Sequence, residues 1–293
     1  MIYENNTCYN FKKITYTNGL LDDAVDATYI IHLEGNGRYE SILKQLELYQ
    51  PTKIVYIVFN KGYKNCNKDE NIVLPAHDLV DAFLQIFKHA NNPSQNYNNI
   101  LILEDDFIFS EKIKVVSTRS NICTFLNTHK NDNFQYLLGC LPLMQFPSTS
   151  DCKNYRTVAS IGTHACIYSK TNRTQLLEIE QTKITDWDLY NCFNTQRYTY
   201  YEPICYQLFP DTENSNNWHK DNIFHVFAKL TKKVMEFFKL DIQVEPGYSF
   251  FYIFSKIVFF LLLFIVLFIV FLIVLFIKNK TQKFKKPKLK KNK

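Results

Sequence analysis

The stretch ILILEDD, residues 100–106, decides the fold of this chain. Its four apolar residues are typical of a strand covered on both faces, which occurs mainly in parallel sheets. The strand runs directly into three adjacent carboxylates, Glu104, Asp105 and Asp106. Open parallel sheets bind ligands beyond the carboxyl ends of their strands, so the acids indicate a site at this end.

The segments around this strand alternate between strand and helix patterns. Short β-branched and aromatic runs predict strands, and apolar residues three or four positions apart predict helices. We expect strands at 27–33, 53–59, 134–138 and 165–168, and helices at 38–49, 79–90 and 173–180. This alternation predicts an α/β fold with a mainly parallel central sheet flanked by helices.

One apolar segment near the C-terminus is long enough to cross a membrane. Residues 257–277 are 21 consecutive apolar residues without a charge or a proline. A helix rises about 1.5 Å per residue, so this run would extend about 31 Å, which matches the thickness of a hydrocarbon core. We therefore expect a single-pass membrane protein with a C-terminal transmembrane helix.

A basic tail follows the apolar segment and dominates the charge of the chain. Residues 278–293 contain nine lysines and no acid, whereas the whole chain has a net charge of +6. The part before the anchor is therefore slightly acidic and has no bulk affinity for nucleic acid. We expect the tail to lie in solvent near anionic lipid headgroups.

Two arguments about membrane orientation conflict. The first 20 residues are polar and contain no signal-peptide pattern, which predicts a tail anchor with the soluble domain in the cytosol. The positive-inside rule would instead place the lysine tail in the cytosol. We favour the first orientation, because translocating the 256 residues before the anchor without a signal is the harder event.

The sequence divides into an N-terminal extension (1–25), an α/β domain (26–222), an amphipathic helix with a linker (223–247), the anchor (257–277) and the tail (278–293). Lysines alternate with apolar positions in the amphipathic helix, which therefore packs on the domain or lies on the bilayer surface; we favour packing. The eight cysteines are too sparse for a disulfide scaffold, and we expect most of them to be reduced thiols.

The three acids after the central strand suit a divalent cation. Side chains alternate along a strand, so Glu104 and Asp106 are expected on one side and Asp105 on the other. Crowded carboxylates raise one another's pKa, and a bound cation removes that repulsion. Oxygen ligands suit Mn²⁺ or Mg²⁺. The alternative is an acidic turn that is simply solvated.

The same stretch resembles the "LEDD" region of glycosyltransferase family 25, a GT-A family that includes lipooligosaccharide and collagen galactosyltransferases. Further segments resemble motifs of that family in the same order: YIIHLE at 29–34 with Arg38, Ala76-His77, GTHACIYSK at 162–170, ITDW at 184–187 and YEPICYQ at 201–207. His32 stands where the family usually has Asn, and Ala76 where it has Ser. The resemblance covers residues 26 to 215 and implies a GT-A-like fold.

The resemblance implies transfer of a sugar, with inversion, from a nucleotide-sugar such as a UDP-sugar to a glycan, lipid or protein acceptor. It places the metal at Glu104 and Asp106, and Asp105 on the ribose or in support of the loop. Asp186 is then the first candidate for the catalytic base and Asp188 the second, although either could simply cap a helix.

Three histidines and one arginine are further candidates at the predicted site. Arg38 could pair with phosphate, and His77 follows a motif segment before a helix, so both are expected to bind the donor. His164 lies in another motif segment, and His219 could supply a late imidazole ligand. Each histidine could equally be a structural or surface residue.

Two other classes of function compete with an active transferase. The first is a binding or structural protein on a catalytically decayed glycosyltransferase scaffold, which the changes at His32 and Ala76 would fit. The second is a metal-dependent phosphoesterase, which usually has more His and Asp at several strand ends than this sequence offers. The intact acids and Asp186 favour the transferase.

Overall fold

The structure is a computed structural model that describes residues 7–209 and 224–285. Its strands are β1 (Tyr9–Thr15), β2 (Ala27–Leu33), β3 (Ile54–Asn60), β4 (Asn99–Glu104), β5 (Phe107–Phe109), β6 (Gln135–Pro147), β7 (Asn154–Ser169), β8 (Arg197–Tyr200) and β9 (Cys205–Gln207). Its helices are α1 (Tyr39–Tyr49), α2 (Pro75–Ala90), α3 (Val116–Thr128), α4 (Lys170–Leu177), α5 (Trp187–Asn194), α7 (Phe224–Phe237) and α8 (Gly247–Lys285), with short 3₁₀ turns at Glu111–Lys114 and Gln181–Lys183.

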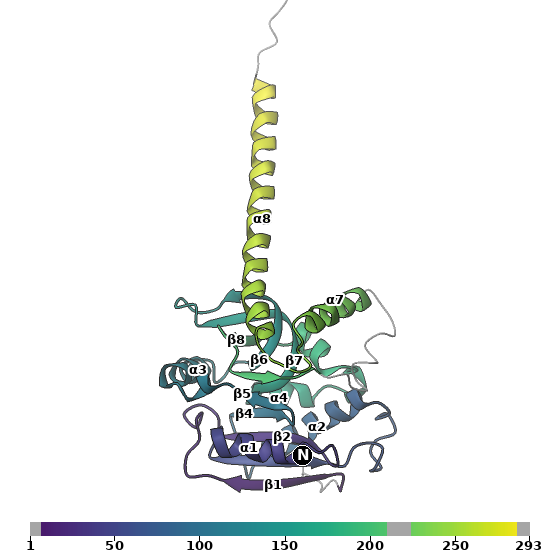
Figure 1. Ribbon diagram of the computed structural model, residues 1–293. Coiled ribbons are helices and arrows are strands. Elements are labelled where there is room, and N and C mark those ends of the chain that lie inside the picture. Colours follow the sequence, from purple (N-terminus) through teal and green to yellow (C-terminus); the bar gives the residue numbers. More distant parts are fainter. Residues whose placement is uncertain (1–6, 210–223, 286–293) are drawn as a thin grey trace, which may run out of the picture.

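Seven strands form one sheet in the order β1-β3-β2-β4-β7-β6-β8, and β5 and β9 form a separate two-stranded ribbon (Figure 1). The α/β fold is confirmed, but the sheet is mixed. β2 pairs in parallel with β3 and β4, and β6 pairs in parallel with β8. The other pairings, including the long β6–β7 hairpin, are antiparallel. The two short runs expected at 134–138 and 165–168 are the buried ends of this hairpin.

The predicted strands of the parallel half agree closely with the structure. β2 has the expected bounds, and β3 and β4 differ from theirs by one residue. Helix α2 begins at Pro75, four residues before the expected start, because proline is tolerated in the first turn, where its missing N–H has no helical partner. β1 belongs to the sheet, so part of the predicted N-terminal extension is an edge strand of the domain.

Strand β4 is covered on both faces, as its sequence predicts. Leu101 and Leu103 pack in a cluster with residues of α1 and α3, and Ile100 and Ile102 pack in a second cluster with residues of α2. All four side chains are fully buried. The strand that carries the acids is therefore fixed rigidly between two cores.

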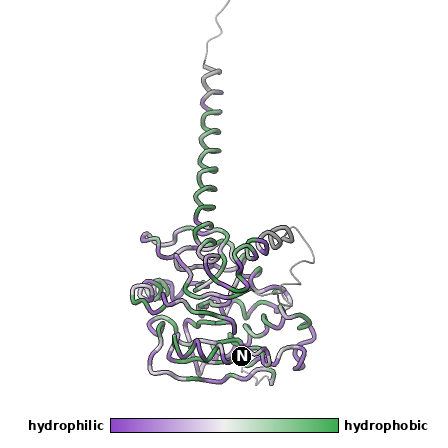
Figure 2. Tube along the Cα trace, viewed as in Figure 1, coloured by the Kyte–Doolittle hydropathy of each residue, from purple (hydrophilic) through white to green (hydrophobic). Residues whose placement is uncertain are grey.

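The base of α8 belongs to the domain. The helix begins ten residues before the apolar run, and its first turns contribute Tyr248, Phe251 and Tyr252 to a third core cluster. Ser255 Oγ donates to Gln145 Oε1 at 2.9 Å. The segment Gly247–Lys278 is long and apolar enough to cross a membrane, and most of its apolar part stands clear of the domain (Figure 2).

Most of the cysteines are free thiols, as expected. Six are unpaired, and four of these are buried in the domain. The other two, Cys8 and Cys66, form a disulfide that ties the residue before β1 to the loop after β3. These partners are 58 residues apart in the sequence, so their spacing gave no sign of the pairing.

Candidate active site

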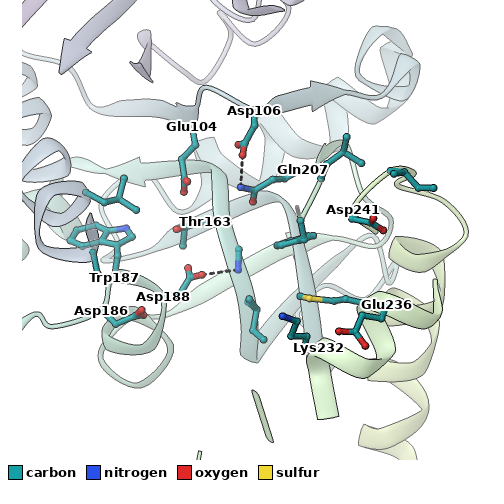
Figure 3. A pocket seen from close by; sticks show the side chains of 18 of the residues that line it. Glu104, Asp106, Thr163, Asp186, Trp187, Asp188, Gln207, Lys232, Glu236 and Asp241 are labelled. Atoms are coloured by element: carbon teal, nitrogen blue, oxygen red, sulfur yellow. Dashed lines mark hydrogen bonds between the residues drawn. The ribbon is translucent and has the colours of Figure 1, made fainter. Parts of the chain in front are cut away.

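The acids after β4 open into a cavity of about 630 Å³. Strand ends, α5 and α7 contribute to its lining (Figure 3). Its polar lining residues include Glu104, Asp106, Thr163, Asp186, Asp188, Gln207, Lys232, Glu236 and Asp241. Glu104 and Asp106 line this cavity and Asp105 does not, so the alternation expected from the strand is confirmed.

Asp105 is held by several hydrogen-bond donors. Its Oδ1 accepts from Arg38 Nη1 at 2.8 Å, and its Oδ2 accepts from the backbone N–H of Leu33 at 3.2 Å and from the side chains of Asn36 and His32. Burial raises the pKa of Asp105, but the hydrogen bonds from His32 and Arg38 outweigh it and hold this pKa below its ordinary value. Asp105 therefore fixes the β2–α1 loop to the end of β4.

Arg38 links Asp105 to Asp106. The same Nη1 atom lies 2.8 Å from Asp105 Oδ1 and 3.0 Å from Asp106 Oδ2. Gln207 Nε2 also donates to Asp106 Oδ2, at 3.0 Å. Asp106 Oδ1 is buried and has no hydrogen-bond partner among the described residues. Asp106 is thus oriented through one oxygen and leaves the other available.

Among the acids of the site, Glu104 has the most strongly shifted pKa. Burial raises its pKa well above the ordinary value, and the negative charges of Asp106, Asp188 and Asp105 raise it further, although Arg38 opposes them. Such an arrangement favours either a proton or a cation between the carboxylates. Perturbed acids gathered in a cavity are typical of functional sites.

Asp186 and Asp188 both lie at the start of α5 and line the cavity. Asp186 Oδ1 accepts from the backbone N–H of Leu189 at 2.8 Å, so Asp186 is the N-cap that its sequence context allowed. Burial and the charge of Asp188 nevertheless raise the pKa of Asp186. Asp188 Oδ2 accepts from Gly162 N at 2.8 Å, and its Oδ1 is buried without a partner in the described residues.

Helix α7 forms a wall of the cavity that the sequence did not predict as part of the site. Lys232, Met235 and Glu236 line the cavity from α7, and Lys239, Asp241 and Ile242 line it from the segment that follows (Figure 3). Packing of the amphipathic helix on the domain is confirmed by the burial of Met235 in the third core cluster. Residue 223, the predicted first residue of this helix, lies outside the described residues.

A second cavity of about 350 Å³ adjoins the first and shares Glu104 and Leu79 with it. Loops after β2 and β3 line it, with Arg38, Lys61 and Lys64 as its cationic members. Glu34, Asp78 and Asp105 line this second cavity too, so a compartment of mixed charge and a mainly acidic compartment lie on either side of Glu104.

The histidines contribute less than predicted. His77 lines neither cavity, and its Nδ1 contacts the backbone oxygen of Asn71 at 3.0 Å. His164 is fully buried, and burial lowers its pKa to about 4, so it is a neutral core residue. His219 lies outside the described residues. Gln207 was not predicted as a site residue, although it is the last residue of the YEPICYQ segment.

The acids fit a divalent cation that is shared with a bound substrate. Among the described residues, no group of three or more His, Cys, Asp or Glu side chains forms a ready-made metal site. Mg²⁺ and similar cations are commonly held by one or two carboxylates, with substrate phosphates completing the coordination. Glu104 and the unpartnered Oδ1 of Asp106 match that donor set.

No family model and no curated protein matches this chain. Among solved structures, it is similar to the viral protein A197 from STIV, with 10% identity, a TM-score of 0.37, and coverage of 62% of this chain and 85% of that one. A likeness of this size carries no conclusion about fold or activity.

Proposed function

We propose that this chain is a membrane-anchored, metal-dependent inverting glycosyltransferase that moves a sugar from a nucleotide-sugar to a hydroxyl acceptor. The observation that carries this proposal is the gathering of Glu104, Asp106, Asp186 and Asp188 in one cavity. That cavity adjoins a smaller compartment, lined by three cationic side chains among its acids, of a size suited to a small ligand. The resemblance of the motifs to glycosyltransferase family 25 supports the same reaction.

The nucleoside diphosphate of a UDP-sugar would occupy the smaller cavity. Arg38, Lys61 and Lys64 supply the positive charge that phosphate oxygens require. The donor sugar would then extend past Glu104 into the larger cavity, because this residue lines both. The donor would thus meet the acceptor between the acids and α7.

Glu104 and Asp106 would hold Mn²⁺ or Mg²⁺, which would offset the charge of the departing diphosphate. Arg38 orients Asp106 through Oδ2 and also pairs with Asp105, so one side chain ties the β2–α1 loop to both acids. Gln207 fixes Asp106 from the opposite strand, β9.

Asp186 would act as the base that removes the proton of the acceptor hydroxyl. Its Oδ1 is fixed by the N-terminus of α5, and burial raises its pKa, which makes its carboxylate a stronger proton acceptor. Asp188 is the second candidate, and its contact with Gly162 ties it to β7. Both lie on the same cavity as Glu104, as a single displacement with inversion requires.

The test uses the full-length protein in detergent, incubated with Mn²⁺ and a panel of UDP- and GDP-sugars. The proposal expects metal-dependent release of nucleoside diphosphate from at least one donor, and loss of that release on addition of a chelator. Failure to turn over any donor, together with retained binding of a nucleotide, would instead favour a binding protein on a decayed glycosyltransferase scaffold.

We propose in addition that the domain faces an oxidising compartment, opposite to the cytosolic orientation expected from the N-terminal sequence. The Cys8–Cys66 disulfide supports this placement, because disulfides persist in oxidising environments. The nine lysines of residues 278–293 would then lie in the cytosol, in agreement with the positive-inside rule.

A further inference from the structure

Exposed apolar side chains gather where α7 turns into α8. Phe237 is 79% exposed and Ile242 is 68% exposed, and Phe250, Ile253 and Phe254 are also exposed. We call these five residues the elbow patch. Soluble proteins rarely expose several large apolar side chains together unless the surface meets a partner or a membrane.

The elbow patch is continuous with the spanning helix. The rings of Phe237 and Phe238 have centroids 5.0 Å apart, those of Phe238 and Phe250 are 4.8 Å apart, and those of Phe250 and Phe254 stack at 5.5 Å. This row of rings connects the end of α7 to the segment of α8 that enters the apolar run at Ile257. A bilayer that surrounds the run would therefore lie next to the patch.

The patch lies at the depth of the headgroups. Phe254 and Phe250 precede Ile257 by three and seven residues, which at about 1.5 Å per residue places them about 5 Å and about 10 Å along the helix from the start of the apolar run. The headgroup region on each side of a bilayer is about 5–8 Å thick, so Phe254 lies within it and Phe250 lies at its outer edge. A second contact agrees with this depth: Phe146 of β6 packs on Phe259, inside the apolar run, with centroids 5.6 Å apart.

The domain cannot swing away from the bilayer on a flexible tether. Tyr248, Tyr252 and Ser255 of α8 are buried in the domain. Lys256 Nζ also donates to the backbone oxygen of Tyr201 at 2.6 Å. The height of the domain above the bilayer is therefore set by the structure, and α7 lies beside the base of α8 (Figure 1).

The larger cavity opens next to this patch. Ile242 belongs to the elbow patch and also lines the cavity, beside Asp241 and Lys239. The side of the cavity formed by α7 is thus the side that meets the headgroups, whereas the donor compartment lies on the far side of Glu104.

We propose that the elbow patch is seated in the bilayer interface and that the acceptor is a hydroxyl-bearing lipid headgroup, which enters the larger cavity from the membrane. This proposal rests on the proposed transferase function. The hydroxyl oxygen of the lipid forms a bond to the anomeric carbon of the donor sugar, and the bond from that carbon to the diphosphate oxygen breaks. The electron pair leaves with the nucleoside diphosphate, and the hydroxyl proton passes to Asp186.

The first arm of the test measures whether the elbow patch lies in the bilayer, and it does not depend on enzymatic activity. Full-length Phe237→Trp and Leu48→Trp variants are placed in phosphatidylcholine vesicles that contain brominated lipid. Leu48 is a matched control, because it is 57% exposed and lies on α1, at the end of the domain away from α8 (Figure 1). We expect bromine to quench the added fluorescence of Phe237→Trp and not that of Leu48→Trp. Equal quenching of the two variants, or none at Phe237→Trp, would overturn the seating.

The second arm measures transfer to glucosylceramide in the same vesicles and to monomeric octyl glucoside in solution. We expect Phe237→Glu to lower transfer to the vesicle acceptor about tenfold, a loss of ~1.4 kcal/mol, with transfer to the soluble acceptor unchanged. Leu48→Glu should change neither rate. A Phe237→Glu protein that keeps full vesicle transfer would overturn the lipid acceptor.

Donor hydrolysis separates this proposal from the proposed function. If the wild type releases nucleoside diphosphate in the presence of Mn²⁺ but glycosylates only the soluble acceptor, the transferase stands and the lipid acceptor fails. If no donor is turned over while Phe237→Trp is quenched, the transferase fails and the seating stands.

Discussion

Asp188 accepts a hydrogen bond of 2.8 Å from the backbone N–H of Gly162, a residue with a φ of +90°. This contact connects the first turn of α5 to the middle of β7. It places both acids of α5 against the cavity, because Asp186 caps the same helix. The left-handed backbone of Gly162 is the reason that its N–H can point at the carboxylate, and only glycine adopts it without strain.

Gly162→Ala should therefore destabilise the protein and slow donor turnover. The φ of +90° costs a residue with a side chain about 1–3 kcal/mol, and the new Cβ would lie 3.2 Å from His164 Nδ1. We expect a melting temperature roughly 2–10 °C lower. Gly35→Ala is the control, because Gly35 has a φ of +82° but no atom within 4 Å of its Cβ position. Equal turnover by both variants would show that the Gly162–Asp188 contact does not position the site.

Asp106→Asn should remove most of the activity while leaving the fold intact. The substitution keeps the shape but removes the negative charge that would hold the metal at the departing diphosphate. Loss of such electrostatic help typically costs about 10²–10³ in rate. Burial raises the pKa of Asp106, which means that folding disfavours its charged form, so the neutral amide should not destabilise the protein at neutral pH.

The check on Asp106 compares turnover, Mn²⁺ dependence and melting temperature in the wild type and in Asp106→Asn. Wild-type turnover in a normally folded variant would remove Asp106 from the mechanism. A reduced Mn²⁺ affinity at unchanged melting temperature would support its predicted role.

Asp105→Asn, unlike Asp106→Asn, should lower the stability of the protein at neutral pH. The hydrogen bonds from His32 and Arg38 hold the pKa of Asp105 below its ordinary value of 3.8, against the effect of burial. A carboxyl with a lowered folded-state pKa stabilises the fold above its unfolded pKa, and that stabilisation is lost as the pH falls through the folded pKa. The variant should therefore melt below the wild type at pH 7, and the difference should shrink as the pH is lowered below about 4. A pH-independent difference would assign the effect to lost shape rather than lost charge.

The parallel half of the fold could be predicted because its strands are buried on both faces and have continuous apolar sequences. The remaining strand segments were not predicted, for physical reasons. β1 is an edge strand that contains Lys12 and Lys13, so its pattern resembles a loop. The outer half of β6 contains two prolines, Pro142 and Pro147, and the outer half of β7 carries polar residues such as Arg156 and Thr157, which pair with β6 and β8. Their sequence therefore gave no strand signal.

The candidate site was predicted more completely than the fold around it. Glu104, Asp106, Asp186 and Asp188 come together as expected, because strand ends and a helix N-terminus meet at one edge of the sheet. The contribution of α7 could not be predicted, since it depends on how the chain returns from β9 to the base of α8. His77 was predicted to bind the donor but lines neither cavity. On α2, a shift of one residue separates a cavity-lining position from a surface position.

Glycosylation at Asn172 should be absent whatever the orientation of the membrane. The sequon Asn172-Arg173-Thr174 is present, but Asn172 is fully buried, and its Nδ2 donates to Asn133 Oδ1 at 2.7 Å. If the domain faces an oxidising, glycosylating compartment, the sequon Asn5-Asn6-Thr7 should carry the glycan. The measurement is the gel shift on glycosidase treatment of the wild type, Asn5→Gln and Asn172→Gln, with a cysteine-labelling assay of Cys8 and Cys66. Free thiols at both positions, together with the absence of a glycan on Asn5, would indicate that the domain faces the cytosol.

A soluble form of the domain should require the base of α8. Cutting after Gly247 would remove Tyr248, Phe251 and Tyr252, which are 0%, 4% and 2% exposed. Each fully buried large apolar side chain stabilises a fold by about 1.5–3 kcal/mol, so their combined loss approaches the total stability of about 5–15 kcal/mol of a typical domain. A chain that ends at Lys256 keeps all three and the Ser255–Gln145 hydrogen bond, yet lacks the apolar run.

We therefore expect residues 1–256 to be a soluble, cooperatively melting protein and residues 1–247 to aggregate or to melt far lower. The measurement is size-exclusion chromatography with thermal melting of the two truncations, side by side. Tyr252→Ala in the longer chain is the matched control, and it should lower the melting temperature without changing membrane release. Equal melting of the two truncations would mean that the first turns of α8 do not support the domain, and the fixed height of the site above the bilayer would then lose its basis.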